Sequence, residues 1–158
     1  MPVNQTRPAA GPEGRLYLKE DELDRAVDLV FAAARHFWKS AEHALAAHDL
    51  GPAHYRALAA IRRSEGLAVS DLQARLGVRK QSLARVLGEL EKAGLIAREP
   101  GRQDRRQRLL LLTAAGREAE RDASAALRER LAHIFRAAGA DAVAGARAVL
   151  GALAEDEA

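Results

Sequence analysis

The sequence predicts a mainly α-helical fold that carries one small β hairpin. Most of its 158 residues lie in alanine- and leucine-rich stretches, where apolar residues recur at three- and four-residue steps. One region differs, because two short runs with strand character, Leu95–Glu99 and Gln107–Leu112, flank a tip rich in glycine, proline and arginine. This length suits one domain, or one domain with a helical extension.

The composition excludes several classes of protein. The chain has no cysteine, which excludes disulfides, thiolate zinc sites and thiol-based redox sensing. It has no apolar run of 18 residues, and its first residues lack the apolar core of a signal peptide. We therefore expect a cytoplasmic protein without a membrane segment.

Positive charge is concentrated in the middle of the chain. The formal net charge is only +3, yet residues 50–113 hold 13 Lys and Arg against 6 Asp and Glu. The rest of the chain holds 12 against 16. This asymmetry indicates that the middle segment binds a polyanion, although a solvated basic face is the plainer alternative.

The terminal regions predict an arm and long helices. Residues 1–20 include a proline-rich stretch without periodicity and predict a mobile arm. The stretch Asp21–His48 carries one wide apolar stripe and predicts a single long helix. After the hairpin, Thr113 is positioned to cap a helix that runs to about Ala137. Gly139 then breaks that helix, and Asp141 caps a last one that ends near Ala154.

Between residues 50 and 94 the sequence predicts three short helices. Ser70 and Gln73 form a capping box that starts the middle helix, and Gly77 supplies a left-handed turn after it. A short helix, a glycine turn and a longer helix have the spacing of a helix-turn-helix unit. The three predicted helices are Pro52–Ser64, Asp71–Leu76 and Lys80–Ala93.

The last of these helices offers polar side chains suited to reading DNA. Its opposite face is apolar, so the polar face is expected to point outward. Arginine and lysine neutralise phosphates or bind guanine edges, glutamine pairs with adenine, and serine serves either base or phosphate. The candidate DNA-binding residues of this helix are Arg79, Lys80, Gln81, Ser82 and Arg85.

The hairpin contains Asp104 and Arg106 in the pattern Asp-x-Arg, followed after five residues by Leu112 and Thr113. With this motif it resembles the wing of the MarR family of winged helix-turn-helix transcriptional regulators, whose wing motif has the same spacing. The segment KQSLARVLGELEKAGLI (residues 80–96) is similar to the family's recognition helix running into its wing. The resemblance implies that Arg106 reaches the minor groove and that Asp104 organises the tip. Arg102 and Arg105 complete the candidate DNA-binding residues of the wing.

One position departs from the resemblance. Position 79, the expected N-cap of the recognition helix, is Arg where relatives often carry Ser or Thr. The missing side-chain cap costs roughly 1 kcal/mol, which suggests that Arg79 contacts phosphate or base instead.

The resemblance also implies a homodimer that pairs through its first and last helices. Independently, the terminal helices carry apolar faces that one small winged domain cannot cover. Two copies related by a two-fold axis place two recognition helices about one DNA turn apart, so the operator is expected to be a near-palindrome. The predicted organisation is a flexible arm (1–20), a helical dimerisation region (21–49 and 114–158) and a winged helix-turn-helix domain (50–113).

A cleft between the dimer helices and the DNA-binding lobe is a candidate effector site, because MarR relatives often bind small aromatic anions there. The residues expected to line this cleft could instead lie in the core or in the dimer interface. For any one of them, that is the favoured interpretation. Without cysteine or i,i+4 spacing, the histidines favour surface positions over a metal site, and we expect no metal or other cofactor. The candidate pocket residues are His36, Phe37, Trp38, Tyr55 and Arg62.

The sequence lacks the motifs of an enzyme. No glycine-rich nucleophile elbow or phosphate loop is present, and the acidic cluster EAER at residues 118–121 is expected on a helix surface. The favoured hypothesis is a dimeric, sequence-specific repressor that binds double-stranded DNA and is released by a small effector. The alternatives are a winged-helix protein-interaction module and a non-specific architectural DNA binder.

Overall fold

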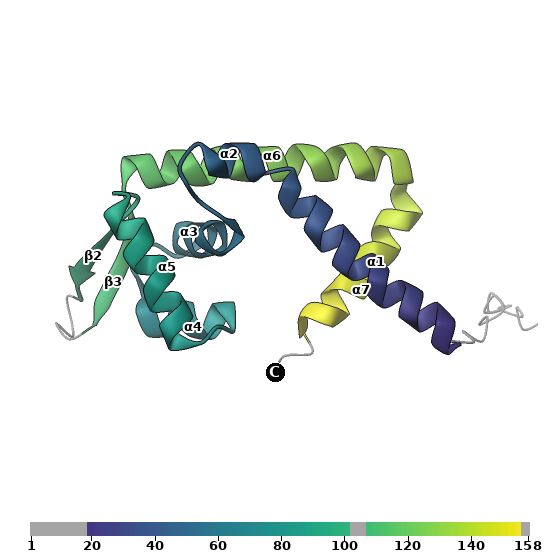
Figure 1. Ribbon diagram of the computed structural model, residues 1–158, viewed down its shortest axis with the longest axis horizontal. Helices are drawn as coiled ribbons and strands as arrows, with labels where there is room; N and C mark the ends of the chain where they lie inside the picture. Colours follow the sequence, from purple (N-terminus) through teal and green to yellow (C-terminus); the bar gives the residue numbers. More distant parts are fainter. Residues whose placement is uncertain (1–18, 102–106, 156–158) are drawn as a thin grey trace, which may run out of the picture. The chain divides into compact units, whose positions relative to one another are not determined.

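The structure, a computed structural model, describes residues 19–101 and 107–155. Contacts within the chain divide it into two units, 1–34 and 35–158, with the boundary inside the first helix. The predicted fold class is confirmed, because helices dominate and one small antiparallel sheet accompanies them (Figure 1). The elements are α1 (Glu20–Lys39), α2 (Glu42–Ala46), α3 (Pro52–Arg63), β1 (Leu67–Ala68), α4 (Val69–Leu76), α5 (Lys80–Lys92), β2 (Ile96–Pro100), β3 (Arg108–Leu112), α6 (Ala114–Ala138) and α7 (Ala140–Glu155).

The sheet has the strand order β1-β3-β2, with antiparallel pairing throughout. The hairpin register pairs Ile96 with Leu112 and Pro100 with Arg108. Strand β1 was not predicted from the sequence. It has two residues, Leu67 and Ala68, which pair with β3, and such a short run shows no period-2 pattern.

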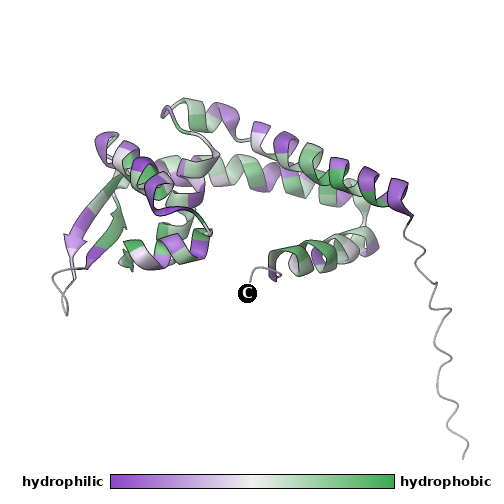
Figure 2. Cartoon of the chain, turned by 60° about the horizontal axis from the view of Figure 1, so that its bottom comes forward, coloured by the Kyte–Doolittle hydropathy of each residue, from purple (hydrophilic) through white to green (hydrophobic). Residues whose placement is uncertain are grey.

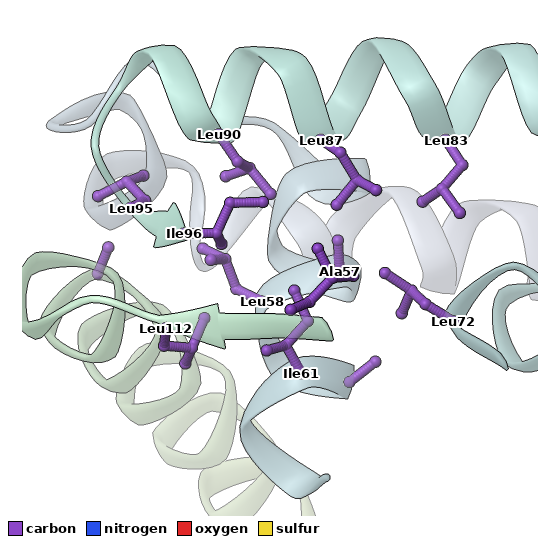
Figure 3. Packing of buried hydrophobic residues seen from close by; sticks show 13 residues of the cluster. Ala57, Leu58, Ile61, Leu72, Leu83, Leu87, Leu90, Leu95, Ile96 and Leu112 are labelled. Atoms are coloured by element: carbon purple, nitrogen blue, oxygen red, sulfur yellow. The ribbon is translucent and has the colours of Figure 1, made fainter. Parts of the chain in front are cut away.

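The core of the helix-turn-helix lobe forms where α5 packs on α3. Figure 3 shows Leu83, Leu87 and Leu90 of α5 pointing toward side chains of α3. Leu58 and Ile61 meet them from α3, and both are fully buried. Burying a leucine or isoleucine side chain stabilises the fold by about 2 kcal/mol. This packing fixes which face of α5 remains outside.

The junction between the hairpin and α6 is built by two residues. Thr113 caps α6 as predicted, because its hydroxyl oxygen accepts a hydrogen bond from the Gly116 amide at 3.0 Å. The same hydroxyl lies 2.8 Å from the carbonyl oxygen of Gly94, to which it donates. Gly116 packs directly against Leu95, whose carbonyl oxygen occupies the space that a Cβ at position 116 would need. The hairpin is therefore seated closely on the first turn of α6.

The prediction of one helix over residues 21–48 is wrong. Helix α1 ends at Lys39, and the amides of Ser40 and Ala41 bond the carbonyls three residues earlier, which tightens the chain into a turn. The turn allows Ala41 and Leu45 to become buried against Ala123 and Leu127 of α6. Packing on α6 overrides the helical continuity that the apolar stripe suggested.

Two predicted caps are also wrong. Helix α4 begins at Val69 rather than at Asp71, because β1 leads straight into it and places Ser70 inside the helix. The Ser70 hydroxyl donates to the carboxylate of Asp71, so it does not form the predicted capping box. Helix α7 begins at Ala140, which puts Asp141 in its first turn rather than at its cap. Among the helices of the described ranges, no segment has the length and apolarity needed to cross a membrane.

Candidate nucleic-acid interface

Helix α5 presents a polar first turn to solvent. Lys80, Gln81 and Ser82 are all exposed, whereas Leu83 is 2% exposed and faces the core. Arg79 precedes the helix in an extended conformation and forms no side-chain cap, so its exposed guanidinium is available for other contacts. The helical period thus separates an exposed polar edge from a buried apolar edge.

The turn before α5 orients this polar edge. Gly77 closes α4 with φ +61°, a left-handed conformation that strains residues with a side chain. Arg56 of α3 donates through Nη2 to the carbonyl oxygen of Leu76 at 3.1 Å, which holds the end of α4 against α3. Leu72 of α4 is fully buried in the shared core. The helix-turn-helix unit is therefore held on α3 from both of its helices.

The hairpin is fastened to α5 by an ion pair. Arg98 Nε on β2 lies 2.8 Å from Glu91 Oε1 on α5. At the far end of the hairpin, the Gly101 amide donates to the carbonyl oxygen of Gln107 at 3.0 Å and closes the base of the tip. The described residues thus place the two strands that lead into the tip. The predicted tip residues Arg102, Asp104, Arg105 and Arg106 lie outside the described residues.

Arg85 forms an ion pair with Glu89, and Glu89 is also contacted by a side chain from α3. Its Nε lies 2.9 Å from Glu89 Oε1, and His54 Nε2 of α3 lies 2.7 Å from Glu89 Oε2. The hydrogen bond from Arg85, followed by that from His54, lowers the pKa of Glu89 below its ordinary value. The hydrogen bond between Arg85 and Glu89, together with the attraction between their charges, raises the pKa of Arg85. Sequence reasoning missed Glu89, although its i,i+4 spacing from Arg85 is visible; His54 is 35 residues away and gave no signal.

The candidate effector residues only partly share one cavity. A cavity of about 420 Å³ is lined by His36 and Trp38 together with the cationic side chains Arg35 and Lys39. The acidic side chain of Glu42, the apolar side chains of Leu45 and Leu50, and the start of α3 complete the lining. Of the five predicted pocket residues, His36 and Trp38 line the cavity.

Phe37 and Tyr55 pack on Trp38 and are not among the lining residues. Their ring centroids lie 5.7 Å and 5.6 Å from that of Trp38. The Tyr55 hydroxyl shares a hydrogen bond of 2.8 Å with the hydroxyl of Ser124 on α6. Both aromatic rings are partly buried and pack against the apolar cluster formed by Ala41, Leu45, Ala123 and Leu127.

Arg62 lies in an ion pair rather than at the cavity. Its Nε is 2.6 Å from Oε2 of Glu120, a residue that is only 2% exposed. Within the described residues, this oxygen accepts no hydrogen bond of good geometry, while Oε1 accepts one from Ser124 at 2.6 Å. The expectation that the acidic cluster at 118–121 lies wholly on the surface is wrong for Glu120. The i,i+4 spacing of Glu120 and Ser124 was the available signal.

Comparison with known proteins gives consistent matches. A model of the MarR family matches residues 48–107. The HTH-type transcriptional regulator PetP of Rhodobacter capsulatus is 44% identical over 145 residues, which cover 92% of this chain and 87% of PetP. The crystal structure of the MarR family transcription regulator SP03579 has a TM-score of 0.75 at 22% identity, over 84% of this chain and 88% of that one. CouR from Rhodococcus jostii RHA1, bound to p-coumaroyl-CoA, has a TM-score of 0.71 at 25% identity, over 84% and 94% of the two chains.

Proposed function

Because this chain belongs to the MarR family, and is thus a DNA-binding transcriptional regulator rather than an enzyme, we propose that it acts as a dimeric repressor on a near-palindromic operator. The observation that carries this proposal is the exposed polar edge of α5, backed by an apolar face buried on α3. A helix of this kind enters a major groove with its first turns toward the bases. We place the protein in the cytoplasm, where such an operator is accessible.

The contacts on DNA divide into two kinds. Gln81 has the paired donor and acceptor that read adenine, whereas Arg79 and Lys80 neutralise phosphates or bind guanine edges. Ser82 and Arg85 extend the same edge of α5. Arg106 enters the minor groove from the wing, with Arg102 and Arg105 on the neighbouring phosphates and Asp104 ordering the tip. Phosphate contacts set affinity and register, and base contacts set sequence preference.

The partner of the terminal helices is a second copy of this chain. Helix α7 buries none of its residues within the described structure, although Figure 2 shows apolar colouring along most of it. Val149, Leu150 and Leu153 are each more than half exposed. On α1, Leu29 and Phe31 are also largely exposed. A helix that is apolar on all sides is normally buried, and pairing across a two-fold axis buries it.

The cavity lined by His36 and Trp38 is the proposed effector site. Arg35 and Lys39 outnumber the one lining carboxylate, Glu42, so the cavity carries a positive balance. Trp38 gives it an aromatic wall, and the two features together suit a small aromatic anion. The structural relative CouR is bound to p-coumaroyl-CoA. An effector that binds more tightly to the DNA-free arrangement would release the operator by its difference in affinity for the two states.

The test is binding to the DNA upstream of the chain's own gene. We expect retention of that fragment at physiological salt and no retention of a scrambled fragment of equal length. Gln81→Ala should relax the preference at one base position. Arg106→Ala should weaken all sites and reduce the salt slope by about 0.9.

Equal retention of both fragments would instead indicate a non-specific architectural binder, and retention of neither would favour a protein-interaction module. Footprinting on the same fragment gives the half-site spacing, which a two-fold dimer fixes at about one DNA turn.

A further inference from the structure

Glu89 is held from two sides by side chains of different helices. Arg85, one turn earlier on α5, reaches Oε1 through its Nε at 2.9 Å. His54 on α3 reaches Oε2 through its Nε2 at 2.7 Å. Both carboxylate oxygens therefore have a partner, and the carboxylate cannot rotate without losing one of them.

His54 is itself fixed by the backbone. The Gly51 amide lies 3.0 Å from His54 Nδ1 and can only donate. Nδ1 must therefore accept, which leaves the proton of the neutral ring on Nε2, where it points at Glu89. The start of α3 thus holds a donor against the carboxylate of α5.

This arrangement leaves the outer part of Arg85 unused. The side chain is 80% exposed, and within the part of the chain that the structure describes neither of its Nη atoms forms an ion pair or hydrogen bond. An arginine held through Nε presents its two Nη groups as a fixed fork, which matches a phosphate or a guanine edge. Arg85 also lies one turn from Gln81, on the exposed side of the same helix.

We propose that Glu89 is a positioning residue that, braced by His54, holds the guanidinium of Arg85 ready to contact DNA. This inference rests on the proposed function, since it requires α5 to read an operator. Holding a long side chain in its bound geometry reduces the conformational entropy lost on binding. The lowered pKa of Glu89 means that the carboxylate remains charged under ordinary conditions.

If Glu89 did not position a cation, its negative charge near the DNA backbone would weaken binding by repelling the phosphates. Simple repulsion predicts that Glu89→Gln tightens DNA binding and leaves the salt slope unchanged or steeper. Positioning predicts that the same substitution weakens binding, because the amide cannot accept from Arg85 and His54 at once. The sign of the change in affinity therefore distinguishes the two.

The experiment measures operator affinity for Glu89→Gln, Arg85→Ala and the double variant across a salt series. We expect Glu89→Gln to weaken binding about fivefold, which is the order expected for freeing one long side chain. In the Arg85→Ala background it should change affinity less than twofold. Arg85→Lys, which keeps the charge but not the fork, should also weaken binding. Glu118→Gln, the same charge change at an exposed position of α6, is the control and should leave affinity unchanged.

Unfolding midpoints of all the variants check that each one is folded. Tighter or unchanged binding by Glu89→Gln, or an equal loss in both backgrounds, would overturn the inference. If the wild-type protein does not distinguish its operator from scrambled DNA, the proposed function fails. If the wild-type protein does distinguish them and Gln81→Ala relaxes its base preference, the proposed function stands. A Glu89→Gln substitution that leaves operator affinity unchanged then counts against the positioning role alone.

Discussion

The helix-turn-helix lobe and α7 use apolar residues in opposite ways. In the lobe, α3 buries five consecutive residues, Ala57 to Ile61, and α5 buries Leu83, Leu87 and Leu90. Helix α7 is more apolar than either and buries none within the described chain. Burial thus follows from the partner surface that is available, and not from hydropathy alone. The lobe completes its own core, whereas α7 has apolar surface that a second copy can cover.

The largest expected effect comes from the close contact between Gly116 of α6 and the backbone of Leu95. Gly116→Ala places a Cβ against the carbonyl oxygen of Leu95, and this backbone cannot move without shifting the hairpin. We expect a loss of about 3 kcal/mol in the free energy of unfolding. Gly88→Ala on α5 is the matched control, because a Cβ there meets no atom within 4 Å. It should be neutral or stabilising by up to about 1 kcal/mol in chemical denaturation. Equal effects of the two substitutions would contradict the close packing.

The next effect tests the unburied region. Leu150→Lys puts a charge on the exposed apolar surface of α7, and a two-fold interface would contain it twice. We expect the dimer dissociation constant to rise about 100-fold, as measured by sedimentation, because burying a charge in place of a leucine is costly. The lobe should remain folded. Ala125→Lys adds the same charge to an exposed position of α6 and should leave the dimer intact. An unchanged dissociation constant for Leu150→Lys would remove α7 from the interface.

A smaller effect concerns the buried polar contact between α3 and α6. Glu120→Ala removes a carboxylate that pairs with Arg62 and accepts from Ser124. Because Arg62 is half exposed and can be hydrated again, we expect a loss of about 2 kcal/mol rather than the larger cost of a fully buried pair. Glu118→Ala, two residues earlier and exposed, should change the unfolding free energy by less than about 0.5 kcal/mol. Similar losses for both would mean that Glu120 is exposed in solution.

The distance along the chain over which a feature is determined explains how much of the fold the sequence could predict. Elements fixed by local signals were predicted correctly: the glycine turn at Gly77, the cap at Thr113, and both hairpin strands to within a residue. The family assignment from the wing motif is also confirmed. These features depend on residues within a few positions of one another, which is what a sequence pattern reports.

Features that depend on distant packing were missed. The turn at residues 40–41 forms because Ala41 and Leu45 pack on α6, some 80 residues later in the chain. The start of α4 shifted because β1 pairs with β3. The contact between His54 and Glu89 joins residues 35 positions apart. No local pattern encodes such pairs, so the positions of the exposed α5 residues could be predicted while the groups that support them could not.

The smallest expected effect tests whether the ion pair with Glu89 is what holds Arg85 in place. The folded-state pKa of Glu89 is lowered, chiefly by Arg85 and then by His54. A carboxylate with a lowered folded pKa stabilises the fold above its unfolded pKa, and this contribution is lost as the pH falls through the folded pKa. Glu89→Gln should therefore differ from the wild type in unfolding midpoint at pH 6, and the difference should shrink as the pH drops below about 4.5. Because the group lies at the surface, the difference should be small and should decrease with added salt. A difference that is independent of pH would mean that the carboxylate stabilises the lobe by packing, and the ion pair would then not be what holds Arg85 in place.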